Sequence, residues 1–146
     1  MYEYIQGRIV ELTPTYVVVD NNGIGYQILI SLNTYTALSG KEQAVVFTHY
    51  IVREDAQILY GFYSKTEREV FRLLLTVSGV GANTARMILS SLSAAELRDA
   101  VLTGNVSVIK SIKGVGQKTA ERIIVDLKDK IGKTEANTDF LFAQSN

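Results

Sequence analysis

The alternation of apolar and polar residues divides the chain into two parts. Over the first 62 residues, short runs rich in β-branched and aromatic residues are separated by turn residues, which is typical of strands. The strand candidates cover residues 16–19, 26–30, 44–52 and 57–62. The turn signals are residues 13–15, 20–23 and 38–41. In all, five short strands, of which these four have clear local signals, are expected within about 60 residues, with little room for helix between them. They predict a small antiparallel barrel, and the OB fold is the best candidate.

The pattern changes to helical spacing at Ser64. Ser64 and Glu67 predict a capping box, in which each residue hydrogen-bonds a backbone amide at the start of a helix. The apolar residues that follow are Val70, Phe71, Leu74, Leu75 and Val77. A second capping box, Ser93 with Glu96, predicts another helix, for which Gly104 would be the C-cap.

The last predicted helix covers residues 117–130, and Gly132 would stop it. Its apolar stripe consists of Ala120, Ile123, Ile124, Leu127 and Ile131. The chain is therefore predicted to be an α+β protein with a barrel domain over residues 1–63 and an all-α domain over residues 64–133. Residues 134–146 are polar and predict a flexible linker or tail.

Two segments of the second part repeat each other at a distance of 35 residues. Residues 77–88 and residues 112–123 align at both glycines of a Gly-x-Gly sequence, at a Thr-Ala pair and at the flanking apolar positions. Each copy follows a short apolar helical segment and opens another helix. The repeat predicts two helix-hairpin-helix motifs in succession.

These hairpins combine features that suit phosphate binding. Glycine permits the positive φ of a very tight turn and lets backbone amides approach a ligand closely. The helix that follows presents unpaired amides and the positive end of its dipole. Lys118 and Arg122 stand four residues apart, so they share a helix face and can neutralise adjacent phosphates, which predicts salt-dependent binding. The predicted DNA-binding residues are Gly79, Gly81, Asn83, Thr84, Gly114, Gly116, Gln117, Lys118, Thr119 and Arg122.

Two other uses of the hairpins stay open. Tight Gly-x-Gly turns can be purely structural, and the second part would then be a protein-docking module. Residues 114–119 also echo a nucleotide-binding P-loop. However, Gln117 stands between the glycine and the lysine of that sequence, the first glycine of the motif is missing, and a helix rather than a strand is predicted before it.

The net charge of zero conceals a segregation of charge. Residues 1–62 carry three basic and six acidic side chains, a net charge of −3. Residues 63–133 carry twelve basic and seven acidic side chains, a net charge of +5, and the remaining residues add −2. A basic module joined to an acidic one indicates nucleic-acid binding better than the total charge does.

The remaining residues limit the other function classes. Cysteine is absent, which excludes disulfides and thiolate metal sites. No apolar run approaches the ~20 residues that span a bilayer, and we expect a cytoplasmic protein. No nucleophile, base and orienting group stand together, so we expect neither an enzyme nor a cofactor or metal, and His49 is interpreted as structural. Tyr2, Tyr4 and Tyr26 would suit stacking on single-stranded bases, although packing in and around the barrel is the default explanation.

The repeat, placed behind a barrel of about 60 residues, resembles the RuvA family. Residues 5–9, 45–62 and 114–128 are very close to that family's pattern, and the resemblance covers essentially the whole chain. It implies an OB fold followed by two helix-hairpin-helix motifs. It also implies a non-catalytic subunit that holds four-way (Holliday) junctions open as a homotetramer or paired tetramers, in recombination and repair. The implied partner is RuvB, a hexameric ATPase that drives branch migration.

The resemblance gives Glu54 and Asp55 a role that their position alone does not. From the residues alone they form the polar tip of a hairpin between two apolar strands, and a solvated turn is the simplest interpretation. The resemblance implies that they form an acidic pin at the centre of the tetramer. Repulsion of phosphates there would disfavour continuous duplex and help to separate strands.

The chain departs from the family's pattern in two ways. Family members often carry Lys at the positions of Asn83 and Gln117, so we expect weaker binding or a greater reliance on backbone amides. The chain also ends where the family's linker to a small third helical domain, which contacts RuvB, would begin. The resemblance thus implies junction binding without stimulation of the ATPase. A generic OB and helix-hairpin-helix DNA-binding module without junction preference, and a protein-interaction adaptor, remain the alternatives.

Overall fold

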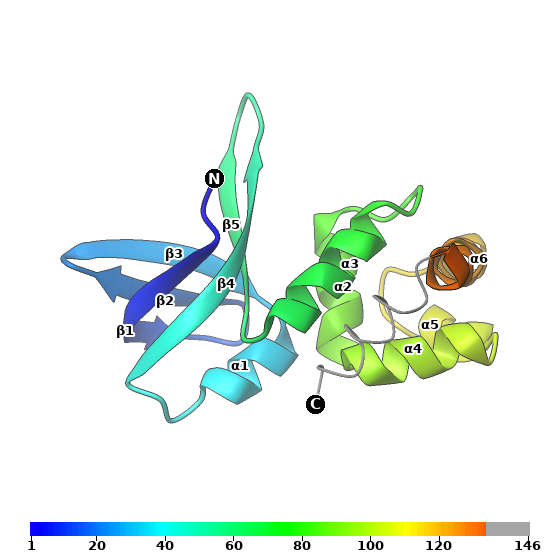
Figure 1. The fold of residues 1–146 in the computed structure, drawn as a ribbon, viewed down its shortest axis with the longest axis horizontal. Helices are drawn as coiled ribbons and strands as arrows, with labels where there is room; N and C mark the ends of the chain where they lie inside the picture. The colour runs from blue at the N-terminus through cyan, green and yellow to red at the C-terminus, as the bar shows by residue number, and fades with distance from the viewer. Residues whose placement is uncertain (134–146) are drawn as a thin grey trace. The chain divides into compact units, whose positions relative to one another are not determined.

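The computed structural model describes residues 1–133, which divide into two compact units (Figure 1). Unit 1 is Met1–Arg68 and unit 2 starts at Glu69, so the division falls inside helix α2 (Lys65–Leu75). The side chains of residues 131–133 are not described, and the tail predicted for residues 134–146 lies outside the described residues.

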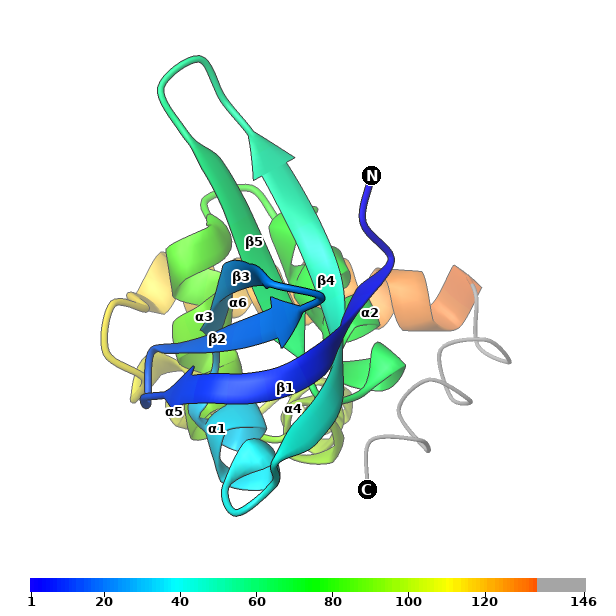
Figure 2. The same cartoon turned by 90° about the vertical axis from the view of Figure 1, so that its left-hand side faces the viewer.

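Unit 1 contains a closed barrel of five strands in the order β1-β2-β3-β5-β4 (Figure 2). The strands are β1 (Tyr4–Leu12), β2 (Tyr16–Asn21), β3 (Ile24–Ile30), β4 (Gln43–Val52) and β5 (Gln57–Phe62). The predicted OB-like barrel is confirmed, but it is not wholly antiparallel. β3 and β5 pair in parallel, with Leu29 opposite Tyr60. They can do so because helix α1 (Leu32–Leu38) and β4 lie between them in the chain and provide the crossover that a parallel pair requires.

Two elements of unit 1 were not located by the sequence pattern. β1 buries only Ile5, so its alternation of apolar and polar residues is weak. α1 is built largely from Thr, Tyr and Asn, which have modest helix propensity. Its one local signal is the N-cap Ser31, whose hydroxyl accepts a hydrogen bond from the Thr34 amide at 3.2 Å. Tertiary packing therefore stabilises α1, which buries Thr34 and Leu38.

Apolar side chains from four strands and α1 fill the barrel. The core cluster is Ile5, Val17, Val19, Ile28, Ile30, Leu38 and Val46. The strands pack so closely that a Cβ on Gly61 would lie 2.4 Å from Ile28 Cγ2 and 2.5 Å from Val46 Cγ1. Glycine at this point of β5 is thus required by space inside the barrel.

The first turn of α2 is tied to α1 by the buried Glu67. Its carboxylate accepts hydrogen bonds from Ser31 Oγ at 2.9 Å and from Thr34 Oγ1 at 2.5 Å. The Ser64 hydroxyl accepts from the Glu67 amide at 3.1 Å, as predicted, but the Glu67 side chain binds α1 instead of returning to Ser64, so only half of the predicted capping box forms. Burial raises the pKa of the Glu67 carboxyl, and the two hydroxyl hydrogen bonds lower it by less.

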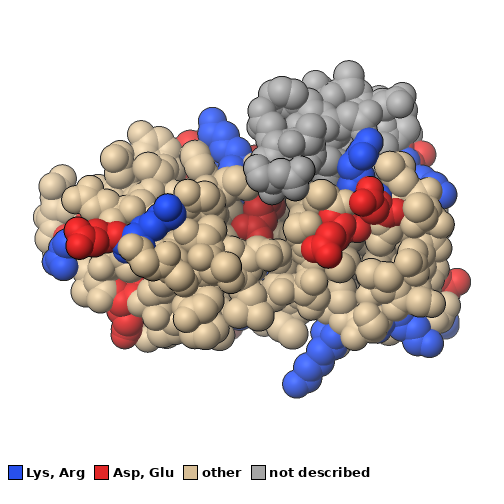
Figure 3. Space-filling model, turned by 90° about the horizontal axis from the view of Figure 1, so that it is seen from below, with Lys and Arg blue, Asp and Glu red and all other residues tan. Residues whose placement is uncertain are grey.

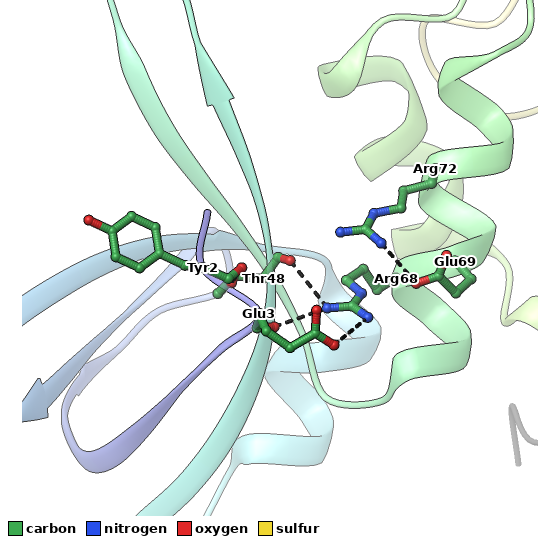
Figure 4. Close-up of polar contacts among 6 residues, drawn as sticks. All are labelled: Tyr2, Glu3, Thr48, Arg68, Glu69 and Arg72. Carbon is green, nitrogen blue, oxygen red and sulfur yellow. Dashed lines mark hydrogen bonds and ion pairs between the residues drawn. The ribbon is translucent and has the colours of Figure 1, made fainter.

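Arg68 makes the second buried polar contact of unit 1 (Figure 4). Its guanidinium pairs with the Glu3 carboxylate at 2.9 Å and donates to the backbone oxygens of Glu3 at 3.0 Å and Thr48 at 3.5 Å. The side chain is 5% exposed, whereas that of Glu3 is 57% exposed. The contact therefore anchors the start of α2 to the first residues of the chain and to β4.

Unit 2 is entirely helical over its described residues. After α2 come α3 (Ala82–Ser91), α4 (Ala94–Leu102), α5 (Val106–Lys110) and α6 (Gln117–Lys133). The capping box of Ser93 and Glu96 is confirmed at the start of α4. Thr103, not Gly104, is the C-cap of α4, and Gly104 follows it with φ 67°. The Gly104 and Asn105 amides donate back to the last turn, as in a Schellman motif.

Helix α6 continues three residues beyond its predicted end, through Gly132 to Lys133. A glycine inside a helix costs about 1 kcal/mol relative to alanine, which does not by itself end a helix. Ala120, Ile123, Ile124 and Leu127 of the predicted stripe are buried. Within residues 1–133, no helix combines the length and apolar character needed to cross a membrane.

Candidate nucleic-acid interface

The two Gly-x-Gly segments form turns of the same geometry. Hairpin 1 (residues 76–81) joins α2 to α3, and hairpin 2 (residues 111–116) joins α5 to α6. Gly79 and Gly114 each have φ 89°, a conformation that residues with a side chain rarely adopt. Equivalent hydrogen bonds close the turns, from Val80 N to Val77 O at 3.1 Å and from Val115 N to Ile112 O at 3.0 Å. The predicted pair of helix-hairpin-helix motifs is therefore confirmed in structure.

Each hairpin leads into a helix whose first amides have no acceptor within the helix. The first intrahelical bond runs from Ala85 N to Gly81 O in α3 and from Ala120 N to Gly116 O in α6, both at 2.9 Å. The preceding amides of each helix point away from its own hydrogen-bond ladder. The N-cap of α3 is Gly81, which has no side chain to cap them. Such a helix start suits an anion.

The second glycine of each hairpin is not explained by the fold. Gly81 has an ordinary extended backbone, with φ −95° and ψ 179°, and Gly116 is not among the glycines with positive φ. No atom lies within 4 Å of the position that a Cβ would take at either residue. The close approach of a ligand to the backbone is a physical reason for glycine at these two positions.

The two hairpins lie close together within unit 2. Thr119 Oγ1, in the first turn of α6, is 3.9 Å from the position of a Cβ on Gly79. Thr84 and Thr119 are half-buried, whereas the other eight predicted DNA-binding residues are exposed. The structure thus gathers the predicted residues on two adjacent turns and on the starts of the helices that follow them. Their contact with DNA stays a prediction.

Lys118 and Arg122 share a face of α6, as predicted. Both are exposed and line one shallow depression, which is completed by Glu121, Val125 and Asp126. Figure 3 shows that, on the face it draws, basic and acidic side chains are interspersed and do not form one continuous basic patch.

Lys110 and Lys113 were missing from the sequence-based prediction. Lys110 is the last residue of α5, Lys113 lies in hairpin 2, and both are exposed. A comparison of charges between the two copies of the repeat would have identified them as candidate phosphate contacts.

Glu54 and Asp55 lie at the tip of the hairpin that joins β4 to β5 in unit 1. Figure 2 shows this hairpin projecting beyond the barrel. Arg53 and Ala56 close the tip by reciprocal backbone hydrogen bonds of 2.8 and 3.4 Å, and the two acidic residues between them are exposed. An exposed acidic tip suits either a solvated turn or the acidic pin.

Other candidate sites fare differently in the structure. Residues 114–119 join α5 to α6, so the strand that precedes a P-loop is missing and the nucleotide-binding interpretation is wrong. Within residues 1–133, no cluster of three potential metal ligands occurs. His49 is half-buried in β4, opposite Tyr60. Tyr2 and Tyr4 lie on the surface, 44% and 52% exposed, and Tyr2 packs edge-on against Tyr26.

Two family models match the chain. The RuvA N terminal domain matches residues 1–61, and the SAM-like helix-hairpin-helix tandem matches residues 71–129. Several curated relatives carry the name Holliday junction branch migration complex subunit RuvA. The relative from Bacteroides fragilis is 56% identical over 131 residues, which are 90% of this chain and 65% of the relative. The relative from Christiangramia forsetii is 49% identical over 146 residues, all of this chain and 76% of the relative. The chain thus spans about two thirds of the length of the first relative and about three quarters of the second.

Proposed function

The chain belongs to the RuvA family, and we propose that it binds four-way (Holliday) DNA junctions as the non-catalytic DNA-binding subunit of a branch migration complex. The observation that carries this proposal is the pair of hairpins, which share one turn geometry and each open a helix with unpaired amides. Their neighbourhood includes the exposed cations Lys118 and Arg122. These features suit two nearby phosphates of a DNA backbone.

Contacts of this kind position a protein on DNA without reading its sequence. Backbone amides and cations bind phosphate oxygens, which are the same at every base pair. Specificity for a junction must then come from its shape. The second part of the proposal supplies the shape: a homotetramer, alone or in pairs, whose four copies place Glu54 and Asp55 at the crossover.

At such a centre, eight carboxylates would repel phosphates. A continuous duplex carries its phosphates through that point, whereas an open junction leaves it free. The penalty therefore falls on the wrong DNA shape and favours a square-planar junction with separated strands. The proposed motor is the ATPase RuvB, and the proposed location of the complex is the cytoplasm. This chain would supply a barrel domain over residues 1–63 and a DNA-binding domain over residues 64–133.

The proposal is tested by a gel-shift titration that compares a four-way junction with linear duplex of the same arm sequences, at two salt concentrations. We expect a strong preference for the junction and weaker binding at the higher salt concentration. Equal binding to both DNAs would refute junction specificity and favour the generic DNA-binding module. No binding to either DNA would favour the protein-interaction adaptor.

A further inference from the structure

We propose that the two hairpins hold DNA by different means: hairpin 2 supplies the ionic contacts, and hairpin 1 contributes backbone contacts with little net charge. The inference rests on the proposed binding of DNA and assigns its salt dependence to one of two adjacent turns. The two copies of the repeat can be compared residue by residue, because each residue of one copy has a counterpart 35 positions away. This comparison of the two hairpins supports the inference.

The backbones of the two copies are equivalent, so any difference in DNA binding must come from side chains. The leading glycines have the same φ, the closing hydrogen bonds differ by 0.1 Å, and the first helical bonds have the same length. The apolar residues at equivalent positions are buried in both copies. Both turns therefore offer similar amides to a phosphate.

The side chains around the two turns differ in charge at five equivalent positions, and at four of these only the second copy carries a cation. Hairpin 2 and its flanks carry Lys110, Lys113, Lys118 and Arg122, and all four are exposed. The counterparts at hairpin 1 are Leu75, Ser78, Asn83 and Met87. Over residues 110–123 the net charge is +3, with Glu121 as the one acidic residue, whereas over residues 75–88 it is +1.

The cations that do lie near hairpin 1 are engaged with the protein. Arg86, the source of the +1, is half-buried in α3. Arg72, in the turn of α2 before the hairpin, pairs with Glu69 at 3.1 Å (Figure 4). Lys130 reaches hairpin 1 from α6, and its ammonium donates to Thr76 Oγ1. A phosphate at hairpin 1 would thus meet amides and neutral side chains first.

This difference has a measurable consequence in the dependence of affinity on salt. Each phosphate neutralised by a protein cation contributes about −0.9 to the slope of log K against log salt concentration. Removing two cations that touch phosphates should flatten the slope by about 2 for each subunit on the DNA. Removing cations that do not touch phosphates should leave it nearly unchanged.

The experiment exchanges residues between the two copies, in the full chain, with a four-way junction as the probe. The variant K118N/R122M gives hairpin 2 the side chains of hairpin 1 at two of these positions, and N83K/M87R does the reverse. The matched control is K128Q, an exposed lysine of the same helix outside the depression that Lys118 and Arg122 line. Thermal unfolding of each variant checks that the fold is kept, which the exposure of all these positions favours.

We expect K118N/R122M to flatten the slope by about 2 per bound subunit and K128Q to leave it close to that of the unaltered chain. We expect N83K/M87R to steepen the slope and raise affinity at low salt, because new cations would face a phosphate already held by amides. The inference is overturned if K118N/R122M flattens the slope no more than K128Q does. It is also overturned if N83K/M87R leaves the slope unchanged, since hairpin 1 would then not face a phosphate. Either result leaves the proposed function intact as long as the unaltered chain prefers junctions. Equal binding of junction and linear duplex by the unaltered chain refutes the proposed function, whatever the salt dependence of the variants.

Discussion

The two glycines of each hairpin should differ in how far their replacement by alanine changes stability. Gly79→Ala and Gly114→Ala place a side chain at φ 89°, which costs about 1–3 kcal/mol. No clash adds to this cost, because the nearest atom to the new Cβ of residue 79 is Thr119 Oγ1 at 3.9 Å. The destabilisation therefore reports backbone strain, reduced by the smaller entropy that alanine gives the unfolded chain.

Gly81→Ala and Gly116→Ala should leave stability nearly unchanged. Gly81 is extended, and the space beside both residues is open. Alanine reduces the entropy of the unfolded chain, which stabilises by about 0.4–1 kcal/mol, but it is a poorer N-cap than glycine. These effects are opposite in sign and similar in size. A change of 1 kcal/mol shifts the Tm of a domain of this size by about 4–8 °C, so thermal unfolding followed by circular dichroism separates the two glycine pairs.

The order of the variants should be the reverse in DNA binding. Gly81→Ala and Gly116→Ala, which should change stability least, should lose the most affinity for the junction. A methyl group at residue 81 or 116 would stand beside the amides that we expect to hold a phosphate. Loss of one hydrogen bond to a charged group costs about 1.5–3 kcal/mol, or roughly a 10- to 150-fold loss of junction affinity in a gel-shift titration. Unaltered affinity of folded Gly81→Ala and Gly116→Ala variants would show that no phosphate lies against these amides. A large loss of stability in them would show that the fold itself requires both glycines.

Three further predictions concern unit 1 and the helix α2 that begins in it. Arg68→Ala should lower the free energy of unfolding by about 2–4 kcal/mol, since it removes a buried guanidinium with three partners. Replacement of the partly exposed Arg72 by alanine should cost less than about 1 kcal/mol. Comparable losses for the two variants in urea unfolding would contradict this expectation. Burial raises the pKa of Glu67 above its ordinary value of 4.5, so the folded state keeps this proton to a higher pH than the unfolded state does. The contribution of this proton to stability is therefore complete below pH 4.5 and is lost as pH rises through the folded pKa. Glu67→Gln should remove this slope from a plot of unfolding free energy against pH, and an unchanged slope would assign it to other groups. Glu54→Gln with Asp55→Asn should leave Tm within about 2 °C, because both carboxylates are exposed, and should raise linear-duplex binding relative to junction binding; an unaltered ratio would count against the acidic pin.

The local features of this protein could be predicted from its sequence. The limits of β5, the start of α2 and the capping box of α4 depend on neighbouring residues, so local patterns were sufficient to predict them. The two hairpins could be found because a repeat aligns each glycine with its counterpart. The resemblance to the RuvA family, which the comparisons with its members confirm, rests on the same segments.

The tertiary structure decided what depends on contacts between distant residues. The parallel pairing of β3 with β5 and the formation of α1 depend on closing the barrel, to which local propensity contributes little. Glu67 has the sequence of a capping-box residue, yet its carboxylate binds two hydroxyls more than 30 positions away, because they offer hydrogen bonds inside the folded unit. The sequence also shows four equivalent glycines in the hairpins. The tight turns require Gly79 and Gly114, whereas the fold does not explain Gly81 and Gly116. Only the φ angle of each glycine and the space beside it distinguish the two pairs, and these are properties of the folded backbone.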